Sequence, residues 1–358
     1  MAATSLLSNL TTRFRSVIYI LVYVSLLLSG FVSRGNRSLR NQLYYVWIFG
    51  LFLFVGFRYR VGCDWGGYLA IFETSRIYET SSTTEQAFWR LNSLLHYLQL
   101  DYPYINVISS GLFFIGLHQI AKRQPDRLAI LILSFPILII NLAMSGIRQA
   151  IALGVLCFAF NAFVDMSVVY FVLFTLLATT FHTSSGAFLM LTPFVRGRFS
   201  RQRIILGAII AMPGIYYLLT SEAYEFYSRR YVGTATEAFG APFRTGLIAL
   251  TGAAFLWYLD RKWKLLYTKD YKFIKLTSYL MVAVFPFSFL SSVGGDRFGF
   301  YLAPIQYIVL ARIPFLIKGP NADMFAVVPY AVGGVTLLTW AMVSSLFEAC
   351  YLPYQTWF

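Results

Sequence analysis

The chain has 358 residues, of which 58% are hydrophobic and 12% are charged. Soluble domains carry roughly 25% charged residues, so this composition excludes an ordinary soluble globular protein. The formal charge of +14 does not indicate nucleic acid as a partner, because basic loops are expected of membrane proteins and no basic, aromatic platform lies outside those loops. Apolar runs long enough to cross a bilayer recur along the whole chain, which predicts an all-α polytopic membrane protein.

Twelve apolar segments are predicted to span the membrane, and the first is expected to be retained because no small-residue cleavage site follows it. Their ranges are 16–32, 43–57, 104–121, 128–144, 149–164, 167–181, 184–195, 204–220, 245–259, 276–291, 299–317 and 324–345. The segment 184–195 is short and is predicted to be a half-helix or a re-entrant piece. A single transmembrane domain over residues 1–358 is expected, with two longer outer loops, 58–103 and 221–244. Apolar spacing over 85–98 predicts a helix lying at the membrane surface.

The distribution of basic residues predicts the orientation. Loops 33–42, 122–127, 196–203, 260–275 and 318–323 hold every lysine of the chain, so their side is assigned to the cytoplasm. The basic residues of the opposite, outer side are all arginines. Because arginine binds two phosphate oxygens at once, one interpretation is an outer cavity for a phosphorylated ligand. The other is that arginine outnumbers lysine in the chain and cytoplasmic lysine bias exaggerates the difference.

The first candidate site directly follows the apolar run 43–57. It contains Arg58, Arg60 and Asp64 around a glycine turn. Charge is costly at such depth, so a cluster there usually has a partner or a function. The arginines are predicted to bind phosphate, and Asp64 either orients them or acts as a base. The alternative is an arginine pair that anchors the helix to lipid headgroups.

Two further candidates lie at outer ends of predicted spans. Arg148 lies at a helix start, where backbone N–H groups favour an anion. The alternative is an arginine reaching the headgroups. His182 has a titration range that suits a general base or a donor to an oxygen, and a polar cap of a helix hairpin is the alternative. His96 and His118 are interpreted as structural.

A fourth candidate repeats the pattern of a glycine turn, an acid and an arginine at a span end. Asp296 is expected either to pair with Arg297 or to orient another arginine. Arg229 and Arg230 lie in an aromatic and basic stretch that binds sugar or anchors the loop at the membrane interface.

The sequence indicates no metal site and no cofactor. The outer acids are scattered, and no phosphate loop or dinucleotide motif is present. Cys63 and Cys350 are expected on the same side, which leaves a disulfide between them open.

Taken in chain order, these residues resemble the EpsG-type, Wzy-like bacterial polysaccharide polymerases. The matching elements are Arg58 to Trp65 with Tyr68, Ile147-Arg148-Gln149, Phe181-His182-Thr183-Ser184, Asp296-Arg297 with Tyr301, and Tyr351-Leu352-Pro353-Tyr354. The pair Gly66-Gly67 stands where the family varies.

The resemblance implies a glycosyltransferase of GT-C-like, lipid-linked-donor architecture in the bacterial inner membrane, with its active face towards the periplasm. Such enzymes make O-antigen of lipopolysaccharide, capsule or exopolysaccharide. They transfer a growing glycan from undecaprenyl diphosphate to the non-reducing end of an incoming undecaprenyl-diphosphate-linked repeat unit, with inversion expected and without a metal. Membrane lipid, a flippase and a chain-length regulator are the implied partners.

On this hypothesis four arginines clamp the diphosphate, and His182 or Asp64 activates or positions the acceptor hydroxyl. The four are Arg58, Arg60, Arg148 and Arg297. The residues expected to bind other parts of the substrate are Tyr68, Gln149, Asp296, Tyr301, Arg229 and Arg230. The competing functions are a lipid-linked oligosaccharide flippase, an O-antigen ligase and, resting mainly on His182, a membrane acyltransferase. A flippase is expected to place charges at mid-depth in several spans and to show repeats, and neither pattern is clear here.

Overall fold

The computed structural model describes residues 17–77, 85–197, 200–220, 240–320 and 322–358. These residues are helical apart from turns, connecting segments and one isolated bridge between Arg58 and Thr356. The chain forms two compact units. Unit 1 contains the chain up to Ile151 and from Ala311 onwards, and unit 2 contains Ala152–Leu310. The single transmembrane domain expected from the sequence stays a prediction.

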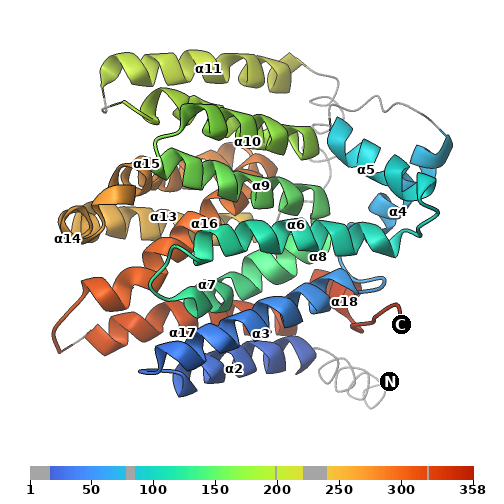
Figure 1. Cartoon of the computed structure of the whole chain (residues 1–358), viewed down its shortest axis with the longest axis horizontal. Helices are drawn as coiled ribbons and strands as arrows, with labels where there is room; N and C mark the ends of the chain where they lie inside the picture. Colours follow the sequence, from blue (N-terminus) through green and yellow to red (C-terminus); the bar gives the residue numbers. More distant parts are fainter. Residues whose placement is uncertain (1–16, 78–84, 198–199, 221–239, 321) are drawn as a thin grey trace. The chain divides into compact units, whose positions relative to one another are not determined.

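Unit 1 is built around α7, whose residues Leu128 to Ser134 are all buried. This helix contacts α2, α3, α6 and α17, and α3 lies along α6 (Figure 1). The elements are α2 (Val17–Val32), α3 (Arg37–Gly56), α4 (Trp65–Ile77), α5 (Gln86–Tyr97), α6 (Pro103–Ala121), α7 (Arg127–Ser134), the π-helix η1 (Phe135–Leu142), α8 (Ala143–Ser145), the start of α9 (Ile147–Val164), the end of α16 (Ser292–Leu316), α17 (Ala322–Val343) and α18 (Ser345–Tyr351). Residues 128–133 of α7 are all apolar, so neighbouring helices can cover every side of this helix.

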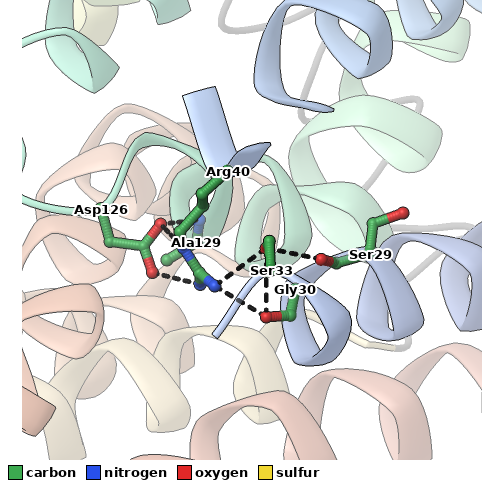
Figure 2. A network of polar contacts seen from close by, with 6 residues as sticks. All are labelled: Ser29, Gly30, Ser33, Arg40, Asp126 and Ala129. Atoms are coloured by element: carbon green, nitrogen blue, oxygen red, sulfur yellow. Dashed lines mark hydrogen bonds and ion pairs between the residues drawn. The ribbon is translucent and has the colours of Figure 1, made fainter. Parts of the chain in front are cut away.

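A polar network joins the helix ends at one end of unit 1. The Arg40 guanidinium forms a two-pronged ion pair with Asp126, and its Nε donates to Oδ1 at 2.8 Å. Its Nη1 donates to the carbonyl oxygen of Gly30 at 2.7 Å and to Ser33 Oγ at 3.3 Å, as Figure 2 shows. Asp126 also accepts from the backbone N–H of Ala129 and so caps α7. Loops 33–42 and 122–127, which the sequence assigned to the same side, are thus in contact within unit 1 through Arg40 and Asp126.

Unit 2 packs aromatic side chains between helices. Phe160 and Phe163 of α9 contact Phe273, with ring centroids 5.3 and 5.1 Å apart. The 3₁₀-helix η2 contacts α10 and α11, and α13 contacts α15. The remaining elements are α10 (Val168–Phe181), η2 (Thr183–Phe194), α11 (Arg201–Thr220), α13 (Ala241–Ala254), the π-helix η3 (Phe255–Leu259), α14 (Asp260–Leu266) and α15 (Thr268–Leu290).

Lysine side chains gather at one end of unit 2. Lys272 Nζ donates to the carbonyl oxygen of Val195 at 2.7 Å, and Lys269 pairs with Asp165 at 3.0 Å. At the same end, Arg196 Nε donates to the carbonyl oxygen of Met166. Loops 196–203 and 260–275, which the sequence assigned to the same side, thus share contacts with the 165–167 turn.

Six helical segments in the described part of the chain are long and apolar enough to cross a membrane, so this is a membrane protein. They are Pro103–Ala121, Arg127–Ser145, Ile147–Val164, Thr268–Leu290, Ser292–Leu316 and Ala322–Val343. Helix is present at all twelve ranges expected to span, but several pieces are short or interrupted, so twelve crossings and a GT-C-like architecture stay predictions. The short range 184–195 is largely η2.

The predicted outer loop 58–103 contains α4 and α5, which contact each other. The buried face of α5 holds Phe88, whose ring lies 5.7 Å from that of Tyr68. Leu94 and Tyr97 are exposed, as a helix at the membrane surface requires, and its contact with lipid stays a prediction. Most of the second predicted loop, residues 221–239, lies outside the described residues.

Candidate functional site

The site loop (residues 57–64) leaves the end of α3 and packs against the α8–α9 junction. Gly62 has φ +110°, and a Cβ at this position would lie 2.0 Å from the carbonyl oxygen of Met144. Arg60 has φ +54°, also in the left-handed region. Glycine at position 62 is therefore required both for the backbone conformation and for the close approach.

The Arg58 guanidinium is buried beneath the site loop, and the residue as a whole is 1% exposed. Nε lies 3.1 Å from the carbonyl oxygens of Val61 and Met144, and Nη1 donates to that of Val55 at 2.6 Å. Burial lowers the pKa of Arg58 to about 10, which leaves it charged at neutral pH. The sequence predicted a phosphate ligand here, and the structure places the side chain among backbone carbonyl groups.

Arg60 and Asp64 lie at the exposed side of the site loop. The Arg60 guanidinium lies over the ring of Tyr59, 5.2 Å from its centroid. Asp64 immediately precedes α4, and Ser145 Oγ donates to its carboxylate at 3.4 Å. These two charged side chains face solvent and are accessible to a ligand.

The C-terminal tail (residues 352–358) pairs with the site loop. A disulfide joins Cys63 to Cys350 just before the tail, which answers the question that the sequence left open. The Tyr59 N–H donates to the carbonyl oxygen of Gln355 at 2.8 Å, and the Trp357 N–H donates to that of Phe57 at 3.3 Å. The last residues of the chain therefore help to shape the loop that contains Arg60 and Asp64.

Arg148 lies in the first turn of α9 and forms an ion pair with Glu85, through Nη1 and Oε2. Its guanidinium also lies over the ring of Tyr68, 5.6 Å from the centroid. Burial raises the pKa of Tyr68, which keeps this phenol neutral. Gln149, the next residue, is buried. Sequence reasoning missed Glu85 as a site residue, although Glu85 is the first residue of the helix predicted over 85–98.

In unit 2, His182 lies between two hydroxyl groups. Its Nδ1 is 2.7 Å from Ser184 Oγ and 3.0 Å from Tyr301 Oη, and the two hydroxyl oxygens are 3.3 Å apart. His182 is the C-cap residue of α10, and Tyr301 belongs to α16. If Nδ1 holds the proton and donates it to a hydroxyl, Nε2 is the basic nitrogen. The arrangement is thus able to orient the imidazole as a proton acceptor.

Asp296 pairs with Arg244, since Arg244 Nε donates to its Oδ1 at 2.7 Å. This agrees with the alternative in which the acid orients another arginine, and sequence reasoning did not include Arg244 among the site residues. Arg297 and Tyr301 are four residues apart in α16 and so share one face of the helix. Arg229 and Arg230 lie outside the described residues.

Among the described residues, no group of three or more His, Cys, Asp or Glu side chains is arranged to hold a metal ion. One polar cluster, in unit 1, contains the ion pair between the Arg148 guanidinium and the Glu85 carboxylate. The other, in unit 2, contains the His182 imidazole and the hydroxyl groups of Ser184 and Tyr301. Guanidinium groups stabilise anionic oxygens, and an imidazole transfers protons.

Comparison with protein families gave a match to the EpsG family over residues 41–356. The matched range includes the site loop, Arg148, Glu85, His182, Asp296 and Cys350. Comparisons with curated proteins and with solved structures gave no match. Because the family match covers most of its length, the chain belongs to the EpsG family.

Proposed function

We propose that this protein is a polysaccharide polymerase that transfers a growing glycan from undecaprenyl diphosphate to an incoming undecaprenyl-diphosphate-linked repeat unit. Membership of the EpsG family supports a polysaccharide polymerase role. The observation that supports a lipid diphosphate substrate best is the guanidinium of Arg148, which lies at the start of a membrane-spanning helix beside Tyr68.

In the proposed reaction a hydroxyl oxygen at the non-reducing end of the incoming unit attacks the anomeric carbon of the growing chain. The bond from that carbon to the diphosphate oxygen breaks, and its electron pair stays on the diphosphate. The proton of the attacking hydroxyl passes to a basic side chain. Attack opposite the leaving group inverts the anomeric carbon. Negative charge grows on the leaving group, so fixed cations close to it lower the barrier.

We assign the diphosphate to Arg148 and Arg60. Both are cationic, Arg60 is exposed and Arg148 is partly exposed. Arg58 donates to three carbonyl groups, so its proposed task is to hold the site loop rather than to bind phosphate. Asp64 is close to Ser145 and is proposed to orient the loop and the acceptor. Arg297 keeps the proposed role of an anion ligand.

We assign proton transfer to His182, with Ser184 and Tyr301 orienting its ring. A base oriented by a hydrogen-bonded third group is the usual arrangement for activating a hydroxyl. Asp296 is proposed to hold Arg244 in place. Stabilisation of the leaving group by arginine needs no metal, and metal independence is part of the proposal.

In the proposed orientation the site loop lies on the periplasmic side of a bacterial inner membrane. Disulfides form and persist in the periplasm and are rare in the cytoplasm, so the Cys63–Cys350 bond supports an outward orientation of this end of unit 1. A flippase that delivers the repeat units and a chain-length regulator are proposed partners.

The direct test uses purified protein in liposomes and one synthetic undecaprenyl-diphosphate repeat unit. A ladder of products that differ by one repeat unit is expected. Movement of unreacted lipid across the bilayer without product would indicate a transporter instead.

A further inference from the structure

The carboxylate of Glu85 forms an ion pair with the guanidinium of Arg148. The side chains are 13% and 28% exposed, respectively, so the pair is mostly shielded from water and salt. Pairs of this kind are stronger than exposed ones because screening is weaker. The contact joins residues 63 positions apart in the chain.

The backbone around Glu85 is held by the packing of α5. The carbonyl oxygen of Glu85 accepts from the Trp89 N–H at 3.4 Å in the first turn of that helix. Phe88 packs against Tyr68, and His96 Nε2 lies 2.7 Å from the carbonyl oxygen of Phe72 in α4. The Glu85 carboxylate is therefore attached to a fixed element and not to a freely moving loop tip.

Two contacts restrain the Arg148 guanidinium. Its central carbon lies 5.6 Å from the centroid of the Tyr68 ring, and its Nη1 is engaged in the ion pair with Glu85. A guanidinium is a planar, rigid group with five N–H donors, so a restraint on one of its nitrogens also limits the directions of the other donors.

We infer that Glu85 is a positioning residue that aims Arg148 at the diphosphate. This inference rests on the proposed function and deepens it. Catalysis by charge stabilisation depends on donors that are already oriented, so a loosened guanidinium would still attract an anion but would stabilise the leaving group less well. Glu85 also neutralises Arg148 locally, so its removal increases ground-state attraction for an anion.

These effects predict a separation of binding from turnover. Glu85→Gln should bind undecaprenyl diphosphate at least as tightly as the wild type, because a competing anion has been removed. Its kcat should fall about ten-fold, because the orientation of Arg148 is lost. Glu85→Asp keeps the charge and should recover part of the loss. An unchanged kcat, or carrier binding more than ten-fold weaker, in Glu85→Gln contradicts the inference.

A matched control lies at the other end of unit 1. The Arg40–Asp126 pair has similar exposure, 23% and 13%, and is not assigned to the site. Asp126→Asn should lower the melting temperature about as much as Glu85→Gln does and leave kcat per folded molecule unchanged. Equal loss of kcat in both variants would mean that the Glu85 effect is only structural.

Exchange of the two charges tests whether the arginine must stand at position 148 and the carboxylate at position 85. The double variant Glu85→Arg/Arg148→Glu keeps an ion pair and should melt close to the wild type, but binding of undecaprenyl diphosphate should weaken more than ten-fold. Retained carrier binding in this variant would overturn the inference. This experiment measures carrier binding and does not require polymer formation. If the wild type formed no polymer, the polymerase proposal would be refuted, but the binding test of the Glu85–Arg148 pair would still be valid.

Discussion

Removal of the Cys63–Cys350 disulfide is predicted to release the C-terminal tail from the site loop. Three hydrogen bonds hold the tail, from the N–H groups of Tyr59 and Trp357 and from Tyr354 Oη to the carbonyl oxygen of Phe54. At about 1 kcal/mol each they contribute about 3 kcal/mol. The stacked ring pairs Phe54–Tyr354 and Phe57–Trp357 add about 1 kcal/mol each.

The opposing term is the entropy of ordering the tail. Fixing residues 352–358 at about 1 kcal/mol each costs about 7 kcal/mol, which is close to what the contacts of the tail supply. The tail is therefore only marginally ordered without the cross-link, and a disulfide typically adds about 2–4 kcal/mol. The chain-entropy relation would give about 6 kcal/mol for the 287-residue separation, but it assumes an unfolded coil, whereas helices in lipid stay formed.

Hydrogen exchange measured by mass spectrometry tests this prediction. In Cys63→Ser, amide exchange in peptides covering the tail and Tyr59 should rise by one to two powers of ten. The control is Cys157→Ala, which replaces the buried free cysteine in unit 2 and should leave these peptides unchanged. Tail protection that is the same in Cys63→Ser and in the oxidised wild type would contradict this prediction.

Three further predictions concern the site loop, the His182 cluster and the need for a metal. Gly62→Ala should lower the free energy of unfolding by about 1–3 kcal/mol and weaken binding of undecaprenyl diphosphate, because a Cβ collides with the Met144 carbonyl group. Thermal unfolding and a binding titration measure these two effects. Wild-type values in both measurements would contradict the prediction. His182→Gln should lower the polymerisation rate at least 100-fold at equal amounts of folded protein, while Tyr301→Phe, which leaves Ser184 on the imidazole, should lower it about ten-fold or less; full activity of His182→Gln removes its proposed role. Treatment with EDTA should leave the rate unchanged, and a loss restored by added Mg²⁺ would show that a metal is needed.

The sequence predicted the helices well because their main determinant is local. An apolar run of sufficient length forms helix in a membrane whatever its neighbours, and every predicted span contains helix. Shape is less predictable, as the 3₁₀ conformation of η2 and the π-helix η1 show. Apolar content by itself does not distinguish these forms from an α-helix.

Side-chain partners depended on tertiary contacts that one sequence does not reveal. Glu85 and Arg148 are 63 positions apart in the chain, and α5, which follows Glu85, packs against α4 and α6. Asp296 had an arginine beside it in sequence, but its carboxylate pairs with Arg244 of another helix. Arg58 stands at the end of an apolar run, where the sequence predicted a phosphate ligand, and the structure adds that its guanidinium donates to the carbonyl groups of Met144 and Val55.

The central claim is that Arg148 stabilises a lipid diphosphate during glycan polymerisation. Its most direct test compares wild-type protein with Arg148→Ala in liposomes with a synthetic undecaprenyl-diphosphate repeat unit, at equal amounts of folded protein. A product ladder is expected from the wild type, and a reaction at least 100-fold slower is expected from Arg148→Ala. An equal ladder from both proteins, formed at the same rate, would contradict it.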